Sequence, residues 1–158
     1  MTEKAAMKRG IETLARGVCV MADTILLCRN RKIGNVYLPG GHIEFGETGA
    51  EALAREIQEE MGCRAKVGRF MGCAEHTFLQ QGNPHAEINL VYELRVTGLA
   101  PDRLPPCTES WIEFFWHPLK RLAFSRCEPA ALRRSLPKWL ASPAAGNLAT
   151  TPIRRPSA

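Results

Sequence analysis

Residues 40–63 (GGHIEFGETGAEALAREIQEEMGC) constrain the fold of this chain more than any other stretch. Thr48, followed three residues later by Glu51, is the pattern of a capping box, which predicts a helix that begins near Gly49. Gly62 is suited to end that helix, because glycine readily adopts the left-handed conformation found just after a helix C-terminus. Apolar residues that share one side of this helix predict a face packed against a core: Ala50, Leu53, Ile57 and Met61.

Three glutamates lie on the stripe beside that apolar face: Glu56, Glu59 and Glu60. Their i, i+3, i+4 spacing brings like charges together, which costs about 0.2–0.5 kcal/mol per pair on an isolated helix. A bound Mg²⁺ would relieve this repulsion, because hard cations take carboxylate oxygens as ligands. Gly40 and Gly41 precede the helix and let the backbone approach a ligand closely, so that a carbonyl can join the metal shell. A solvated acidic face is the alternative for the three glutamates alone.

The residues from Gly41 to Cys63 match the pattern G-x5-E-x7-R-E-U-x-E-E-x-G-U, with U apolar, at every fixed position. In this stretch the chain resembles the Nudix box, the signature of the MutT-like Nudix hydrolases, and no subfamily is assigned. The resemblance implies an α/β fold, a Nudix-type α/β/α sandwich with a mixed β-sheet between the box helix and a C-terminal helix. It covers the box closely and the rest of the chain only in general layout.

The resemblance also implies an activity, the divalent-metal-dependent hydrolysis of a phosphoanhydride bond in a nucleoside diphosphate linked to another moiety. The cofactor is then Mg²⁺, with Mn²⁺ able to replace it. Carried over by position, the metal ligands are Gly41, through its carbonyl, and Glu56, Glu59 and Glu60. Glu56 is alternatively the general base.

The expected catalytic set is Glu56, Glu109 and Arg55. Arg55 is expected to hold the loop by pairing with Glu47 or a box glutamate. Family members also recruit an acid from outside the box, and Glu109, shortly before Trp116, is our first choice, with Glu87 and Glu113 as alternatives. A surface carboxylate is the competing interpretation for each of them.

Residues expected to bind substrate lie in two polar segments. The basic loop at 29–32 lies close to the box, and Arg29 and Arg31 there could contact phosphate, although a solvated turn fits the loop equally well. His85 and Glu87 belong to the second segment, where Asn89 could join them in a polar cluster. Aromatic side chains offer base-stacking platforms, but most of them should be core.

The substrate itself stays open at this point. Neither the proline that marks ADP-ribose hydrolases nor the tyrosine that marks dinucleoside polyphosphate hydrolases stands downstream of the box, where Leu79 is found. ADP-ribose and nucleotide sugars are the first expectation, and nucleoside triphosphates, oxidised ones included, are the alternative. A nucleotide-sensing Nudix module without activity is a second class, although such modules usually lack box acids that this chain keeps.

Composition bounds the remaining possibilities. The 158 residues include 45% hydrophobic and 23% charged residues, which fits one domain over residues 1–140. From 141 to 158 the composition shifts to small and polar residues, which predicts a disordered or partner-dependent tail. The net charge of +5 favours an RNA-directed enzyme only weakly, and the lack of a dense basic–aromatic motif argues against a nucleic-acid partner.

The expected partner is therefore a small-molecule nucleotide, with no membrane partner, and a homodimer is compatible with the family. Six single cysteines without C-x-x-C spacing and a start without a signal peptide predict a reduced, cytoplasmic protein. Along the chain we expect a polar lead-in at 1–13 and a loop at 79–86. The expected strands are 15–22, which pairs with 24–29, then 36–39, 65–78, 87–97 and 112–116, and a closing helix covers 128–140.

Overall fold

Helix α1 spans Gly49–Met61 and confirms the helix predicted from the capping pattern. The Thr48 hydroxyl accepts a hydrogen bond from the Glu51 backbone N–H (3.3 Å), and the Glu51 carboxylate accepts one from the Thr48 N–H (2.7 Å). Gly62 ends the helix in the left-handed region, with φ of 67°. Both ends of the helix therefore follow from local capping.

The computed structural model describes residues 10–150, and the strands of that part form two sheets. One sheet has the order β10-β6-β7-β1-β5, and the other has the order β2-β3-β4-β9 with β8 paired to β3. The strands are β1 (Ile11–Val18), β2 (Val20–Met21), β3 (Thr24–Asn30), β4 (Val36–Tyr37), β5 (Gly40–His42), β6 (Ala65–Gln80), β7 (Asn83–Val96), β8 (Ile112–Pro118), β9 (Cys127–Glu128) and β10 (Asn147–Thr150). A 3₁₀-helix, η1 (Leu119–Phe124), and α2 (Ala130–Ala141) complete the set.

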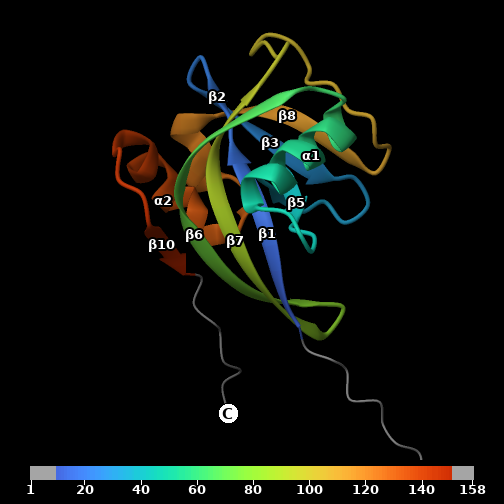
Figure 1. Cartoon of the computed structure of the whole chain (residues 1–158), viewed down its shortest axis with the longest axis vertical. Helices are drawn as coiled ribbons and strands as arrows, with labels where there is room; N and C mark the ends of the chain where they lie inside the picture. The colour runs from blue at the N-terminus through green and yellow to red at the C-terminus, as the bar shows by residue number, and fades with distance from the viewer. Residues whose placement is uncertain (1–9, 151–158) are drawn as a thin grey trace, which may run out of the picture.

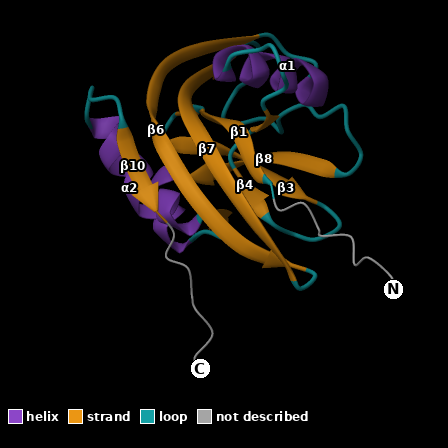
Figure 2. Cartoon of the chain, turned by 60° about the horizontal axis from the view of Figure 1, so that its bottom comes forward, coloured by secondary structure: helices purple, strands orange, loops and turns teal. Residues whose placement is uncertain are grey.

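The strands lie between the two α-helices, with α1 on one side and α2 on the other (Figures 1 and 2). Helix α1 packs on β5, β1 and β6, and α2 packs on β9, η1 and β10. This is the expected α/β arrangement, with two sheets in place of the single mixed sheet that we predicted. Both sheets mix parallel and antiparallel pairs.

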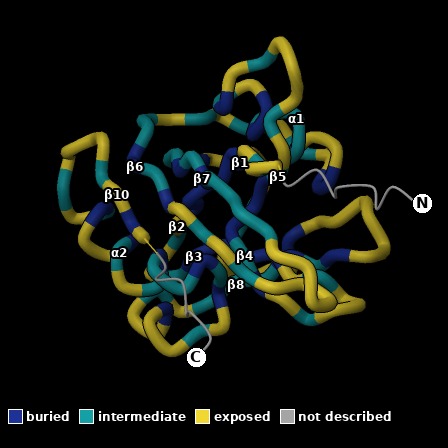
Figure 3. Tube along the Cα trace, turned by 90° about the horizontal axis from the view of Figure 1, so that it is seen from below, coloured by how far each residue is buried: buried dark blue, intermediate teal, exposed yellow. Residues whose placement is uncertain are grey.

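The core consists of two hydrophobic clusters, one on each side of β3. Leu26 and Cys28 face the cluster that contains Leu53 and Ile57 of α1. Ile25 and Leu27 face the cluster that contains Leu132 and Leu136 of α2. A strand buried on both faces is expected to be apolar at successive positions, which explains the run ILLC in β3. Figure 3 shows these buried segments inside a shell of exposed loops.

The start of the chain departs from the prediction. Of the expected first strand, only Val20–Met21 pairs with β3 as a hairpin. Strand β1 instead begins at Ile11 and pairs in parallel with β7 and antiparallel with β5. The predicted lead-in is therefore wrong for residues 11–13, and residues 1–9 lie outside the described part. Partners more than 70 positions away in the sequence leave no local trace in the pattern of β1.

The loop predicted at 79–86 is also wrong. Strands β6 and β7 run on to Gln80 and from Asn83, and Leu79 pairs with Pro84. Only Gln81 and Gly82 form the turn, and both have positive φ, 50° and 79°. That conformation belongs to a two-residue hairpin turn. The glycine and proline of this stretch are typical of loops, and for that reason the sequence predicted a longer loop.

The predicted tail from 141 to 158 needs a correction as well. Asn147–Thr150 form β10, which pairs in parallel with β6 from Asn147 opposite Gly72 to Thr150 opposite Glu75. The Asn147 amide donates to the Met71 carbonyl (2.7 Å) and anchors the start of the strand. Residues 151–158 lie outside the described part. Neither α-helix of residues 10–150 is long and apolar enough to cross a membrane.

Candidate active site

Arg55 ties the loop before α1 to the acidic face of the helix. Its Nε and Nη2 donate to the two carboxylate oxygens of Glu47 (3.1 and 2.7 Å), so the pairing expected from the sequence is present. Its Nη2 also donates to the His42 carbonyl, and its Nη1 donates to Glu56 and Glu59, each at 3.1 Å. The fork geometry of guanidinium allows these simultaneous contacts, which orient two box glutamates at once.

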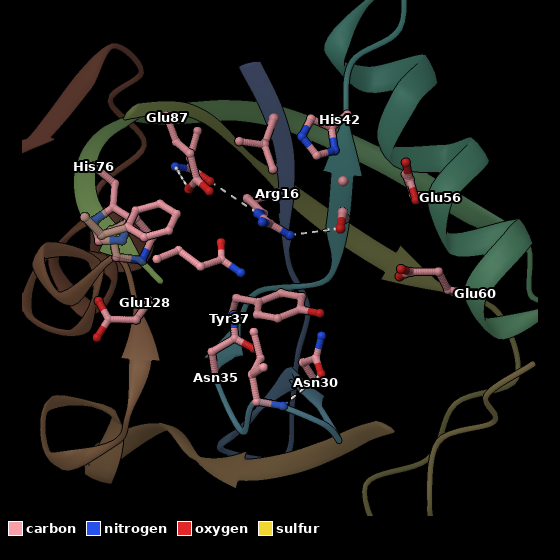
Figure 4. A pocket seen from close by; sticks show the side chains of 18 of the residues that line it. Arg16, Asn30, Asn35, Tyr37, His42, Glu56, Glu60, His76, Glu87 and Glu128 are labelled. Atoms are coloured by element: carbon pink, nitrogen blue, oxygen red, sulfur yellow. Dashed lines mark hydrogen bonds between the residues drawn. The ribbon is translucent and has the colours of Figure 1, made fainter. Parts of the chain in front are cut away.

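A cavity of about 680 Å³ opens beside α1. Figure 4 shows Glu56 and Glu60 on its α1 wall and Glu87, His76 and Glu128 across from them. Gly41 of β5 lies against Glu56, because a Cβ at this position would stand 2.5 Å from a Glu56 carboxylate oxygen. The Gly41 backbone therefore lies close to the Glu56 carboxylate, and a larger residue at this position would displace that side chain.

Glu60 is the buried carboxylate of this wall. The residue is 7% exposed, and its Oε2 is buried without a hydrogen-bond partner among residues 10–150. Burial, with the neighbouring Glu56 carboxylate next in size, raises the pKa of Glu60 to about 8. A buried acid that lacks a partner and faces a second carboxylate suits a bound cation, so the residues present fit a divalent metal.

Glu59 stands apart from this pair. Its side chain is 57% exposed and receives its hydrogen bond from Arg55, and Glu59 does not line the cavity. Within residues 10–150 no group of three or more His, Cys, Asp and Glu side chains is already gathered for metal binding. The protein side of the candidate metal site therefore consists of Glu56, Glu60 and the Gly41 backbone, with Glu59 at its edge.

Arg16 is a site residue that sequence reasoning missed. Only 9% exposed, it lines the cavity and donates to the carbonyls of Leu38 (3.2 Å) and Gly40 (2.9 Å) and to the Asn89 side chain (3.2 Å). Its guanidinium lies 4.9 Å from the centre of the Tyr37 ring. A single arginine inside the apolar run ARGVCVMA was the available signal, because a buried arginine needs partners.

The wall across from α1 is rich in polar and aromatic groups. His76 Nδ1 is buried without a partner, and burial lowers the pKa of this imidazole. The His76 ring stacks on Phe78 with centroids 4.8 Å apart. Glu87 accepts a hydrogen bond from the Asn89 amide (3.4 Å), which confirms part of the predicted polar cluster. His85 does not line the cavity; it also stacks on Phe78, with centroids 5.2 Å apart, and contacts Glu12.

Four other candidate residues lie outside the cavity. Arg29 pairs with Glu113 (3.0 Å) and Arg31 donates to the Ile112 carbonyl, and neither arginine lines the cavity, although Asn30 of the same loop does. Glu109 is exposed, yet its charge contributes to the raised pKa of Glu60. The hydrogen bond from the Thr108 backbone N–H to the Glu60 carbonyl (2.8 Å) holds the loop of Glu109 beside the end of α1.

The sequence matches the model of the NUDIX domain over residues 12–141. The chain belongs to the Nudix family. Among curated proteins, this Nudix chain is 31% identical over 99 residues to diphosphoinositol polyphosphate phosphohydrolase 2 of Rattus norvegicus, which covers 60% of this chain and 52% of that protein. It is 41% identical over 59 residues to an ADP-ribose pyrophosphatase of Methanocaldococcus jannaschii, which covers 35% of each.

The Nudix chain therefore spans about half or less of the length of these curated relatives. Among solved structures, the MutT protein from Methanosarcina mazei Go1 superposes with a TM-score of 0.63 at 19% identity, over 86% of this chain and 97% of that one. This likeness shows that the Nudix fold extends beyond the box to most of the chain.

Proposed function

We propose that the protein is a divalent-metal-dependent pyrophosphohydrolase that cleaves a phosphoanhydride in a nucleoside diphosphate linked to another moiety. The observation that carries the proposal is the pair Glu56 and Glu60 on one cavity wall, with a Glu60 oxygen left without a partner. The Nudix box and the relatives that act on pyrophosphate bonds support the same reaction class. Mg²⁺ is the proposed metal, with Mn²⁺ able to replace it.

The box residues have distinct proposed roles. Glu60, Glu56 and the Gly41 carbonyl would hold the cation, with Glu59 at the edge. A divalent cation held there supplies charge neutralisation for the phosphates and acidifies a bound water. Arg55 positions Glu56 and Glu59 through its hydrogen bonds and need not touch the substrate.

The proposed reaction also needs a base that accepts a proton and a residue that binds phosphate. Glu56 or Glu109 would take the proton of the attacking water, and Glu87, on the opposite wall, is the alternative base. Arg16 lines the cavity with a permanent positive charge, which suits a phosphate oxygen.

The wall opposite α1 supports a substrate whose far end carries hydrogen-bond donors instead of phosphates. Glu87 and Glu128 both line this wall, and carboxylates accept hydrogen bonds from hydroxyl and amine groups but repel phosphate. Phe78 adds an aromatic surface suited to a sugar or a base. These features favour ADP-ribose or a nucleotide sugar over a diphosphoinositol polyphosphate, which carries phosphates around its ring.

The direct test is product release from a substrate panel with Mg²⁺ or Mn²⁺. The panel contains ADP-ribose, nucleotide sugars, nucleoside triphosphates, an oxidised dGTP, dinucleoside polyphosphates and a diphosphoinositol polyphosphate. We expect turnover of ADP-ribose or a nucleotide sugar that disappears when the metal is chelated. Metal binding without turnover of any compound would contradict the proposed activity and favour the nucleotide-sensing module instead.

Glu128→Gln tests the role of the opposite wall. We expect KM for the preferred sugar-linked substrate to rise about tenfold with kcat nearly unchanged, because a hydrogen bond to a charged acceptor is lost far from Glu56 and Glu60. Steady-state kinetics on the full-length protein measures both constants.

Glu93→Gln is the matched control for this variant. Glu93 pairs with Arg69 at 2.7 Å and is 43% exposed, much as Glu128 pairs with Arg133 at 2.6 Å and is 41% exposed, but Glu93 does not line the cavity. An equal change of KM in both variants would show that Glu128 does not contact the substrate.

A further inference from the structure

A second cavity, of about 500 Å³, lies on the other side of β3 from α1. It shares no lining residue with the first cavity, and its Leu27 and Val36 belong to the hydrophobic cluster of α2. No acidic residue of the described part of the chain lines it. Its remaining polar and aromatic lining consists of Arg29, Phe115, His117, Phe124, Ser125 and Arg126. The candidate active site uses none of these side chains.

The basic groups of this cavity are only partly neutralised. Arg29 pairs with Glu113 and lies over Phe115, with its guanidinium carbon 4.8 Å from the ring centre. Arg126 is exposed and makes no ion pair within residues 10–150. His117 contributes a buried Nε2 that has no hydrogen-bond partner among the described residues. The cavity therefore combines positive charge with an unpaired polar atom, which a ligand could satisfy.

An exposed aromatic ring lies beside these groups. Phe124 at the end of η1 is 87% exposed, although burying a phenylalanine side chain usually stabilises a protein by about 1.5–3 kcal/mol. A flat ring that lines the same cavity as two guanidinium groups suits a ligand with a planar base and a phosphate. A volume of about 500 Å³ is in the range of small-molecule sites.

We propose that this second cavity binds a phosphate-bearing mononucleotide independently of the metal site. The phosphate accepts hydrogen bonds from Arg126 and Arg29, His117 Nε2 contacts a polar atom of the ligand, and the base packs on Phe124. The basic loop that the sequence suggested for substrate thus contributes Arg29 to a different site, on the opposite side of β3 from the box.

The test is a titration of the ¹⁵N-labelled full chain with adenosine monophosphate in EDTA, followed by amide chemical shifts. EDTA removes divalent cations, so the carboxylates of the α1 cavity repel phosphate. We expect saturable shifts at residues 117 and 124–126, and weaker binding of inorganic phosphate and of adenosine, each of which offers half of the ligand.

Variants separate the contributions of charge and ring. Arg126→Glu should weaken binding by about tenfold or more, because a charge-assisted contact becomes a repulsion. Phe124→Ser should weaken the binding of the nucleotide but leave the binding of inorganic phosphate unchanged. The fold should tolerate this substitution, because an exposed ring contributes little to folding. Arg134→Glu is the control, because it makes the same charge change on an exposed face of α2 outside the cavity. It should leave the affinities for the nucleotide and for inorganic phosphate unchanged.

Three results would overturn the proposal. Shifts that do not saturate, or that centre on the α1 cavity, would place no site at residues 117 and 124–126. An equal loss of binding in Arg134→Glu would show that Arg126→Glu acts only through the overall charge of the protein. Equal affinity for phosphate and nucleotide would show that Phe124 does not bind the base.

Discussion

Glu60→Gln is expected to lower metal-dependent turnover by at least about a hundredfold. Residues that only support metal ligands typically cost about 10–100-fold when changed, and the loss of a proposed ligand should be at least as large. The substitution keeps the size of the side chain but removes the charge that would hold a cation at the buried wall. Its Oε2 has no partner that the amide would leave unpaired, so the fold should survive. Turnover on the substrate panel and Mn²⁺ binding by calorimetry should fall together.

Glu44→Gln is the control for Glu60→Gln. Glu44 is exposed, lies in the loop before the same helix and does not line the cavity. Activity and Mn²⁺ affinity should stay near those of the unmodified protein. Full Mn²⁺-dependent turnover in Glu60→Gln would show that this residue is not a ligand.

Gly40→Ala should cost about 3 kcal/mol or more of the free energy of unfolding. Gly40 has φ of 127°, which L-residues rarely adopt, and an added Cβ would overlap the backbone carbonyl oxygen of Ala15 on β1. The added Cβ is bonded directly to the β5 backbone and the oxygen belongs to the β1 backbone, so relief requires that β5 separate from β1. Denaturant unfolding followed by circular dichroism measures the loss.

Gly46→Ala is the control that separates the steric overlap at Gly40 from the cost of placing a side chain at positive φ. Gly46 also has positive φ, 93°, but an added Cβ there would meet no atom within 4 Å. We expect a loss of only about 1–2 kcal/mol, the usual cost of placing a side chain in this conformation. Similar losses in the two variants would mean that β5 can shift away from β1 at little cost.

The parts of the site that local patterns predicted are those that local chemistry determines. Thr48, Glu51 and Gly62 set the ends of α1 through hydrogen bonds within a few residues. Spacing along that helix and its preceding loop also brought Arg55 to Glu47. These contacts join residues that are close in the sequence, so local patterns are enough to predict them.

The missed parts depend on distant partners. Arg16 became a site residue because its strand lies between β7 and β5, a placement that pairs Arg16 with Val91 and with Gly40. Glu128 entered the cavity wall through the short parallel pairing of β9 with β4. Two-residue strands carry no periodic pattern, and parallel register over such separations is decided by packing of the whole domain.

The two walls of the cavity pack against different core clusters. Glu56 and Glu60 stand on α1, whose Ile57 packs in one cluster, whereas Glu128 follows Cys127, which packs in the other. Substitutions around α2 and β9 can therefore reshape the wall of Glu128, where we propose that the rest of the substrate binds, without repacking the acidic helix. Under the proposed function, such a layout would let substrate preference diversify within a lineage while the hydrolytic chemistry is inherited unchanged.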